Sequence, residues 1–512
     1  MKKSIAMVLC LALLMTLFAG CQEEKPAYVP TGDGLADGNP NRPAVTPPSG
    51  DGQAVSLLYD PAAGLNPYSC VSYTNRALFS LLYQGLFTVD RNYRVSPMLC
   101  ESYNISADMK TYTFYISDVL FADGTAVTAE DVAASLTAAK GSAWYGGRLQ
   151  HITSVSAYGD AVMVELDTAM EDLPILLDVP IVKAAQVKTE APIGTGPYRL
   201  DGDQLRRVAG WWCSADLTVS GDTVPLIEAG TAAENRDRFE IDGVSLVCTD
   251  PASVNFVDFH SDYELWEVEN GLFLYLACNI ESEVFSNTKV RAALTHAIDR
   301  EKLVDDYYRN FARAAQLPCS PLSPHYEEDL AVNYGYAPDR LKTVLEQEGL
   351  SGSEITLLLN GDDAIRVRVG NAIADMLEEA GLVVTVDEST TADFADDLKD
   401  HKDEDAYDLY LAQTRLSANM DLSAFFGADT ALNYGGLANA ELYQVSLEAL
   451  ANAGNYYTLY ERIMDRGLLC PILFQSYAVF TQRGALSSLT PARDNLFYYD
   501  LGRTLEDALI RE

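Results

Sequence analysis

Residues 354–386 carry the pattern of a strand, a helix and a second strand. Residues 354–359 form an apolar run typical of a buried strand, residues 365–380 have the periodicity of a helix, and residues 382–386 form another strand-like run. Gly381 follows the helix directly, where glycine commonly ends one. Strands joined by such a crossover helix run parallel, and helices cover the faces of a parallel sheet. The pattern therefore predicts an α/β fold.

The upstream half is also mixed α and β. Residues 111–116 alternate and are rich in β-branched and aromatic side chains, as in a strand, and Gly159-Asp160 separates two strand-like runs as a hairpin turn would. Thr128 and Asp131 form a capping box that opens a helix. In the downstream half the remaining predicted elements are two helices and a strand, at residues 287–308, 339–347 and 408–412.

The chain has 512 residues, more than the roughly 250–300 at which one hydrophobic core stops growing, so two or three domains are expected. Its 74 acidic residues outnumber 36 basic ones, and the net charge is −38. Nucleic acid and anionic lipid require clustered lysine and arginine. We therefore expect no nucleic-acid partner.

The first twenty residues predict a signal peptide. Lys2 and Lys3 precede an apolar stretch at residues 5–18 that is too short to span a membrane, and Cys21 follows two small residues. This layout resembles the bacterial lipoprotein signal, which implies that Cys21 is lipidated and becomes the mature N-terminus. An ordinary secretory signal cut nearby is the alternative.

Residues 22–53 contain six prolines and five glycines and hardly any large apolar side chain. Such a segment cannot bury enough surface to fold, so it predicts a tether with a reach on the order of 30 Å. With Cys21 it predicts a protein that is lipid-anchored to the cell membrane and faces outside the cytoplasm.

Catalytic motifs are missing from the sequence. No G-x-S-x-G elbow, G-x-x-x-x-G-K-[ST] phosphate loop or H-E-x-x-H zinc helix occurs. Gly194-Thr-Gly196 begins like a dinucleotide loop, but Pro197 removes a backbone donor and predicts a rigid turn. His296 is expected to pack inside a helix. The acidic run at residues 396–405 lacks the glycine and spacing of a calcium loop, which favours a solvated helix end.

The nine cysteines become seven once Cys10 is removed with the signal and Cys21 is lipidated. The seven are scattered and never spaced as C-x-x-C, so neither a zinc site nor a redox pair is predicted. Cys248 and Cys278 lie in apolar strand-like runs and are expected to be buried thiols. We expect no enzyme, no cofactor and no metal.

Six segments, in order along the chain, resemble the extracellular solute-binding proteins of ABC transporters, the family 5 type that binds oligopeptides, dipeptides and nickel chelates. They are Tyr83-Gln-Gly-Leu-Phe87, residues 95–102, residues 111–116, residues 121–132, Ile193-Gly-Thr-Gly-Pro-Tyr198, and Asn279 with residues 289–300. Each motif alone is modest, but six in this order are specific. The match runs from about residue 54 to the C-terminus.

The resemblance implies a two-lobed, periplasmic-binding-protein-like fold of type II, with mixed sheets and a hinge, that closes around a ligand in the cleft between its lobes. Lobe 1 would comprise residues 54–275, with an extra subdomain at about 70–185. Lobe 2 would comprise residues 276–470, and residues 471–512 would return to lobe 1. The motifs identify the fold and do not name the ligand.

The resemblance also implies candidate ligand-binding residues. Peptide-binding members use an aspartate in a "W.aDy.dP..fL" segment to pair with the free amine of the peptide. In the corresponding residues 415–426, Ala418 occupies the aspartate position and Arg415 the tryptophan position. An arginine in the cleft offers a planar fork to a carboxylate, and the alternative is a rim residue or one paired with a neighbouring acid. Further candidates are Asn419, Asn433 and Tyr434 near the same wall, and Tyr68 and Tyr275 opposite.

These observations predict a substrate-binding lipoprotein of an ABC importer. It would be a monomer that captures a small peptide, or a peptide-like or anionic solute, and delivers it to the permease. The alternative is a sensory module of the same fold that docks a membrane receptor. An extracytoplasmic hydrolase is a third hypothesis, which the missing nucleophile motifs disfavour.

Overall fold

The computed structural model describes residues 55–213, 221–241, 243–253, 255–399, 406–483, 490–491 and 496–497. The predicted signal peptide, the predicted lipid site Cys21 and the predicted tether lie outside these residues. No helix in the described part is both long and apolar enough to cross a membrane. Within the same residues, no group of three or more histidine, cysteine and acidic side chains is arranged to hold a metal ion.

A large mixed sheet organises the fold. Its eleven described strands follow the order β15-β14-β16-β12-β17-β11-β1-β10-β9-β8, with β13 added to β17. Their bounds are β1 (Leu57–Tyr59), β8 (Tyr198–Asp201), β9 (Gln204–Arg207), β10 (Thr223–Glu228), β11 (Leu246–Thr249), β12 (Tyr263–Cys278), β13 (Ala312–Ala314), β14 (Glu354–Asn360), β15 (Val383–Ser389), β16 (Leu409–Arg415) and β17 (Leu469–Gln482).

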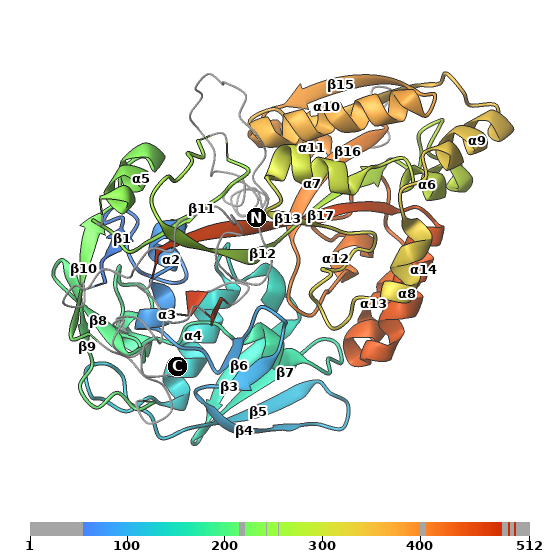
Figure 1. The fold of residues 1–512 in the computed structure, drawn as a ribbon. Coiled ribbons are helices and arrows are strands. Elements are labelled where there is room, and N and C mark those ends of the chain that lie inside the picture. The colour runs from blue at the N-terminus through green and yellow to red at the C-terminus, as the bar shows by residue number, and fades with distance from the viewer. Residues whose placement is uncertain are drawn as a thin grey trace.

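Two long antiparallel strands, β12 and β17, link the two bodies of the molecule. Figure 1 shows them passing from the body that carries β1 and β8–β10 to the body that carries β14–β16. The register of β12 shifts between Glu269 and Phe273, where Gly271 has a φ of 72°. Positive φ suits glycine at such a bulge. The predicted α/β class is confirmed, whereas the lobe boundaries along the chain stay predictions.

The predicted strand–helix–strand unit is confirmed. β14 and β15 run parallel, with Glu354 opposite Val383, and α10 (Ala364–Glu379) connects them. The helix predicted at residues 287–308 is instead two helices, α6 (Thr288–Leu294) and α7 (Arg300–Tyr308). The cause is Asp299, whose side chain accepts a hydrogen bond from the Lys302 N–H and starts α7 as its N-cap.

The other helices of this body surround the sheet and its loops. They are α8 (Glu328–Ala331), α9 (Asp339–Glu348), α11 (Thr391–Asp397), α12 (Ser423–Phe426), α13 (Ala440–Ala451) and α14 (Tyr456–Asp465). α9 ends where predicted, because Gly349 takes a φ of 73° as its C-cap.

The other body contains a separate four-stranded sheet in the order β4-β5-β7-β6. Its strands are β4 (Cys100–Ile105), β5 (Thr111–Ile116), β6 (Ile152–Tyr158) and β7 (Ala161–Leu166), and α4 (Ala129–Lys140) contacts β6 and β7. The same body also carries α2 (Tyr73–Arg76), α3 (Phe79–Leu82), α5 (Ala232–Glu240) and the hairpin of β2 (Phe87–Val89) and β3 (Val95–Pro97). The predicted capping box of α4 and the predicted β6–β7 hairpin are confirmed.

The turn at residues 194–197 is a packing element, as the sequence predicted. A Cβ on Gly194 would lie 2.3 Å from the carbonyl oxygen of Leu82, and one on Gly196 would lie 2.4 Å from that of Leu81. Both carbonyls belong to α3, so only glycine lets the turn approach this helix. The motif therefore serves the fold.

The buried thiols and His296 also have the packed environments predicted for them. Of the seven cysteines among the described residues, six are buried and Cys248 is half-buried. Burial raises the pKa of the Cys248 thiol to about 12 and that of Cys278 further. His296 is 7% exposed, and its Nδ1 lies 2.8 Å from the carbonyl oxygen of Gly335. Part of the acidic run, residues 400–405, lies outside the described residues.

Candidate functional site

β16 ends at Arg415, beside the bulge of β12. Leu272 is its cross-strand partner, and Nη1 of Arg415 donates to the carbonyl oxygen of Asn270. Nη2 lies 3.4 Å from the hydroxyl of Tyr73, a residue 342 positions earlier in the chain. Arg415 therefore lies where the two bodies meet at their linking strands.

Two guanidinium groups approach the ring of Trp144. The Cζ of Arg76 lies 3.6 Å from the ring centroid, and the Cζ of Arg415 lies 4.4 Å from it. A cation within about 6 Å of an indole ring is attracted by the ring quadrupole. Arg76 ends α2, Trp144 follows α4, and Arg415 ends β16, so three distant segments build this contact.

Arg76 is a buried cation without a carboxylate partner among the described residues. It is only 4% exposed. Nη1 donates to the carbonyl oxygens of Pro67 at 3.3 Å and Cys70 at 3.2 Å, and Nη2 donates to the Tyr145 hydroxyl at 2.9 Å. Burying a charge without an opposite charge costs free energy. A bound anion would lower that cost.

Unsatisfied donors gather around the same ring. Within the described part of the chain, Nε of Arg76, Nε1 of Trp144 and Nδ2 of Asn270 are buried and have no hydrogen-bond partner. Each of these nitrogens can only donate. Asn270 is 1% exposed, and its Oδ1 already accepts from the Leu272 N–H at 2.9 Å. The site therefore suits a ligand group rich in acceptors, such as a carboxylate.

Two tyrosines complete the wall. The ring centroids of Tyr73 and Tyr477 are 4.6 Å apart, and those of Tyr73 and Trp144 are 5.7 Å apart, both edge-to-face. Burial holds the pKa of Tyr477 well above its usual range, so its phenol stays neutral. We call the set of Tyr73, Arg76, Trp144, Arg415 and Tyr477 the arginine–tryptophan cluster.

The three tyrosines predicted from the sequence as ligand-binding residues are not members of the arginine–tryptophan cluster. Tyr275 is fully buried and stacks on Phe273 at 5.1 Å, and its hydroxyl has no hydrogen-bond partner among the described residues. The Tyr68 hydroxyl donates to the carbonyl oxygen of Pro180 at 2.7 Å. Tyr434 is 5% exposed, and burial raises its pKa to about 12.

Of the two predicted asparagines, Asn419 is buried and Asn433 is half-buried. Nδ2 of Asn433 donates to the carbonyl oxygen of Ala428 at 3.4 Å, whereas its Oδ1 is buried without a described partner. Asn419 is 3% exposed and places Nδ2 3.8 Å from Sδ of Met170.

Of the predicted site residues, Arg415 belongs to the arginine–tryptophan cluster. Sequence reasoning missed its other four members and Asn270, because they come from separate elements and share no motif. The one available signal was rarity, since Trp144 is one of four tryptophans in the chain.

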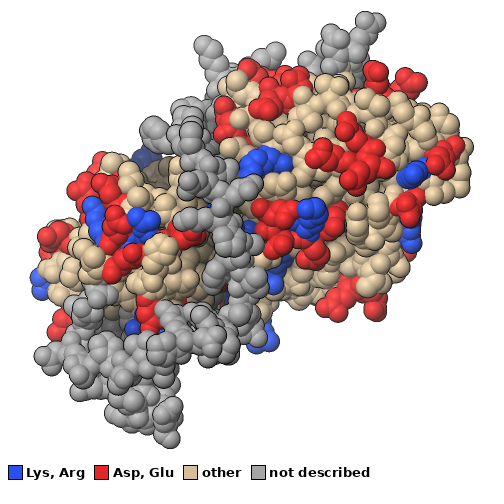
Figure 2. Space-filling model, turned by 45° about the horizontal axis from the view of Figure 1, so that its top comes forward, with Lys and Arg blue, Asp and Glu red and all other residues tan. Residues whose placement is uncertain are grey.

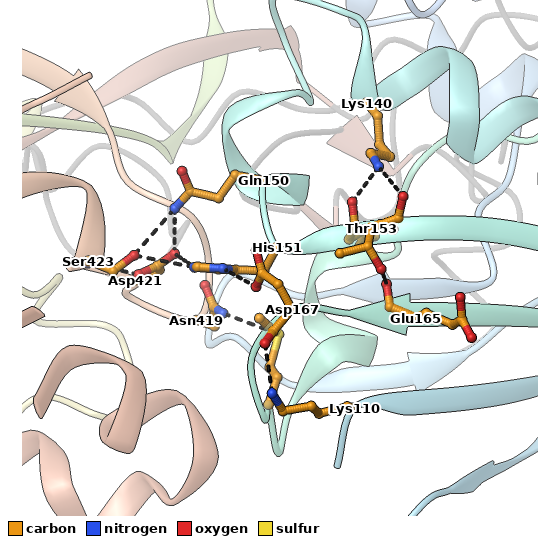
Figure 3. A network of polar contacts seen from close by, with 12 residues as sticks. Lys110, Lys140, Gln150, His151, Thr153, Glu165, Asp167, Asn419, Asp421 and Ser423 are labelled. Atoms are coloured by element: carbon orange, nitrogen blue, oxygen red, sulfur yellow. Dashed lines mark hydrogen bonds and ion pairs between the residues drawn. The ribbon is translucent and has the colours of Figure 1, made fainter. Parts of the chain in front are cut away.

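A second polar network joins the four-stranded sheet to the loop after β16 (Figure 3). Nδ1 of His151 lies 2.8 Å from Oδ1 of Asp167, and Nε2 lies 3.1 Å from Oδ2 of Asp421 and 3.3 Å from Oγ of Ser423. Gln150 also donates to Asp421, at 2.8 Å. A carboxylate faces each ring nitrogen, and this arrangement favours the protonated ring over the neutral one.

The serine of this network is buried, and a carboxylate contacts each ring nitrogen of its histidine. Ser423 is 1% exposed, and Nε2 of His151 faces Asp421 as well as the serine hydroxyl. Burial acts to lower the pKa of His151, but Asp421 and Asp167 outweigh it and the pKa is raised. The arrangement is built to tie two segments together.

Comparison with known proteins identifies a family and individual proteins whose sequences are similar to this chain. The model described as bacterial extracellular solute-binding proteins, family 5, middle, matches residues 94–432, more than half of the chain. A glutathione-binding protein, GsiB of Shigella boydii, is 25% identical over 346 residues, which are 63% of this chain and 66% of GsiB. The chain thus spans just under two thirds of the length of that relative.

Solved structures share the fold over more of the chain. The ABC transporter substrate-binding protein CtaP of Listeria monocytogenes matches with a TM-score of 0.71 at 18% identity, over 89% of this chain and 99% of its own. NikA of Brucella suis, solved in complex with Fe(III)-EDTA, matches with a TM-score of 0.69 at 18% identity, over 87% of this chain and 99% of its own. These matches confirm the predicted two-lobed fold.

Proposed function

The chain belongs to the bacterial extracellular solute-binding proteins of family 5, and from this we propose that it captures a small, peptide-like anionic solute for an ABC permease. The family acts outside the cytoplasm, in agreement with the predicted export signal. The names of the relatives, a glutathione-binding protein and an ABC transporter substrate-binding protein, support capture and delivery rather than the signalling alternative.

The arginine–tryptophan cluster carries the proposal for an anionic ligand. Arg76 is buried without a described carboxylate partner, and donors without acceptors surround it. A hydrogen bond to a charged group contributes about 1.5–3 kcal/mol. The surface shown in Figure 2 carries many more acidic than basic groups, so an anion has no broad basic patch to bind on that face.

Closure couples ligand binding to delivery. The cluster takes Arg415 from β16 and Tyr73, Arg76 and Trp144 from the other body. A ligand held by both sides favours the closed state in proportion to its extra contacts there. The permease would then recognise the closed form. We place lobe 1 at residues 54–275 and lobe 2 at residues 276–470, as the resemblance implies.

We include the other ligand-binding residues predicted from the sequence in the proposed site, as residues that line the ligand outside the arginine–tryptophan cluster. The Tyr275 hydroxyl and Oδ1 of Asn433 support this role, because both are buried without a described partner. A polar ligand group or a small shift on binding would satisfy them. Asn419, Tyr434 and Tyr68 are included on the resemblance alone.

Lipidation of Cys21 would anchor the protein at the outer face of the cell membrane. The tether at residues 22–53 would have a reach on the order of 30 Å, which would let the folded monomer contact the permease. We therefore propose a monomeric lipoprotein as the form that delivers the solute.

Native mass spectrometry of the mature chain, residues 22–512, tests capture directly. The folded protein would be exposed to a metabolite extract, washed and denatured, and the released small molecule identified. We expect an anion that carries at least one carboxylate. Release of a neutral or purely cationic solute would overturn the anionic ligand, and failure to retain any small molecule, with glutathione also tried as a probe, would overturn solute capture.

A further inference from the structure

Glu269 is a buried acidic residue of β12, and it lies directly before the bulge of this strand. It is only 6% exposed, and each of its carboxyl oxygens accepts from a hydroxyl group, Oε1 from Tyr93 at 2.5 Å and Oε2 from Ser320 at 2.6 Å. Its cross-strand partner is Ser476 of β17. Side chains alternate between the faces of a strand, so Glu269 projects from the face opposite to Tyr477 of the arginine–tryptophan cluster.

The two hydroxyl groups come from different bodies. Tyr93 lies in the turn between β2 and β3 and has a φ of 62°, which a tyrosine rarely adopts. Asp90 fixes this turn, because its Oδ1 accepts from the Arg94 N–H at 2.9 Å. Ser320 is fully buried in the segment that leads from β13 to α8 in the other body. Glu269 therefore contacts both bodies at the strand that links them.

The two residues after Glu269 hold the end of β16. The carbonyl oxygen of Asn270 accepts from the guanidinium of Arg415, and that of Gly271 accepts from the Leu416 N–H at 3.1 Å. A rotation of the backbone at the bulge would move both carbonyl groups, and the guanidinium of Arg415 with them. The orientation of Arg415 therefore depends on how firmly the bulge is held.

We propose that Glu269 is a positioning residue of the ligand site. The hydroxyls of Tyr93 and Ser320 hold its carboxylate, and the bulge fixed in this way orients Arg415 toward the ligand. Hydroxyl-to-carboxylate hydrogen bonds as short as these two are strong. The inference rests on the proposed function and adds a residue that acts on the site without touching the solute. A change in the angle between the bodies would alter these contacts, so they also couple the bulge to closure.

Hydrogen exchange at the Leu416 amide measures this role without any ligand. This N–H bonds to the Gly271 carbonyl, so its exchange reports opening of the bulge. Glu269→Gln keeps the size of the side chain, but the amide nitrogen cannot accept, so one hydroxyl loses its acceptor. We expect exchange at Leu416 to become about tenfold faster, the factor that corresponds to 1.4 kcal/mol. Mass spectrometry with fragmentation resolves this amide.

Glu267→Gln is the matched control on the same strand. Glu267 lies two residues before Glu269 and bonds instead to Arg313 at 2.9 Å and to Ser476 at 2.7 Å. This control should leave exchange at Leu416 unchanged. Equal acceleration in Glu267→Gln and Glu269→Gln would reveal a general loosening of β12 and overturn the assignment.

Tyr93→Phe removes one hydroxyl and leaves the carboxylate of Glu269 with its bond to Ser320. It should also accelerate exchange at Leu416, and it carries the same test if Glu269→Gln does not fold. Tyr83→Phe is its control, because the Tyr83 hydroxyl is another buried donor, to the carbonyl oxygen of Leu65 at 2.8 Å. Equal exchange in Tyr93→Phe and Tyr83→Phe would contradict the positioning role.

Calorimetric titration with glutathione tests whether Glu269 acts through Arg415. Glu269→Gln alone should weaken binding by about tenfold, the same 1.4 kcal/mol. In the double variant with Arg415→Ala, binding should stay within about twofold of Arg415→Ala alone, because two residues that act through one group are not additive. Fully additive losses would overturn the route through Arg415.

The two measurements separate this inference from the proposed function. Unchanged exchange at Leu416 in Glu269→Gln overturns the positioning role, whether or not glutathione binds. If the wild type neither binds glutathione nor retains a small molecule from the extract, solute capture fails. Faster exchange in Glu269→Gln would in that case still establish that Glu269 fixes the bulge.

Discussion

Nε2 of His151 lies 3.1 Å from Oδ2 of Asp421, a contact between groups that are 270 residues apart in the chain. His151 precedes β6 in the four-stranded sheet, and Asp421 follows β16 in the other body. Further contacts cross the same boundary, from Asn419 to Met170 at 3.8 Å and from the Glu171 N–H to the carbonyl oxygen of Leu450 at 2.8 Å. Opening of the two bodies at this boundary would have to break them.

The His151–Asp421 contact gives closure a pH dependence. The pKa of His151 is raised, so its stabilising effect is complete below the ordinary value of 6.5 and is lost as the pH rises through the raised value. Burial opposes ionisation of Asp421, but His151 lowers its pKa overall, so that contribution is lost only as the pH falls through a value below 3.8. The groups that face the ring are Asp167, Asp421 and Ser423. Gln150 donates to the Asp421 carboxylate, and Lys110 donates to the Asp167 carbonyl.

We therefore expect His151→Gln to lower the free energy of unfolding by about 1.5–3 kcal/mol at pH 6 and by clearly less at pH 9. Urea unfolding at the two pH values measures this difference. His260→Gln, at an exposed position, is the control and should show no such pH dependence. An equal loss at both pH values would show that the imidazolium charge contributes nothing.

Gly196→Ala should destabilise the fold through a steric clash. Its Cβ would lie 2.4 Å from the Leu81 carbonyl oxygen, and backbone atoms cannot yield as a flexible side chain does. Forcing a methyl group into such a contact costs about 1–3 kcal/mol. Gly147→Ala, which would meet no heavy atom within 4 Å, is the matched control in a chemical denaturation experiment. Similar unfolding midpoints for the two variants would contradict close packing of the turn on α3.

Cys21→Ala should release the protein from membranes, because the proposed lipid anchor requires its thiol. Fractionation of cells expressing each form, followed by detection in membrane and soluble fractions, measures the effect. Cys10→Ala, inside the predicted signal, should leave the mature protein on the membrane. Retention of Cys21→Ala in the membrane fraction would refute lipid anchoring at this residue.

Local patterns predicted the elements well, and tertiary contacts explain what they missed. Residues 111–116 were predicted as a strand and form β5 with the same bounds, because alternation of side chains reports a sheet with one buried face. The single helix predicted from residue 287 was wrong, since the periodic pattern concealed a cap at Asp299. A single side-chain hydrogen bond at an N-cap can start a new helix where the previous one could have continued. The periodicity of apolar residues does not report such a hydrogen bond.

The candidate site was less predictable than the fold. Arg415 was found because it occupies a position in a family motif, whereas Tyr73 and Trp144 lie outside all six segments that resemble the family. They reach Arg415 only through pairing of β12 with β16 and β17. Such a meeting depends on contacts spanning 342 residues, and no local pattern of side chains encodes it.

Arg415→Ala should weaken binding of an anionic ligand by about 1.5–3 kcal/mol, the range for a hydrogen bond to a charged group. Calorimetric titration with glutathione as the probe measures the change, and Arg206→Ala, at an exposed position, is the control. Arg415→Lys should recover only part of the loss, because an ammonium group lacks the planar fork that bonds a carboxylate twice and stacks on Trp144. An unchanged dissociation constant in Arg415→Ala would show that Arg415 does not contact the ligand and is a residue at the rim of the cleft. Full recovery in Arg415→Lys would instead show that charge alone, without the guanidinium geometry, holds the ligand.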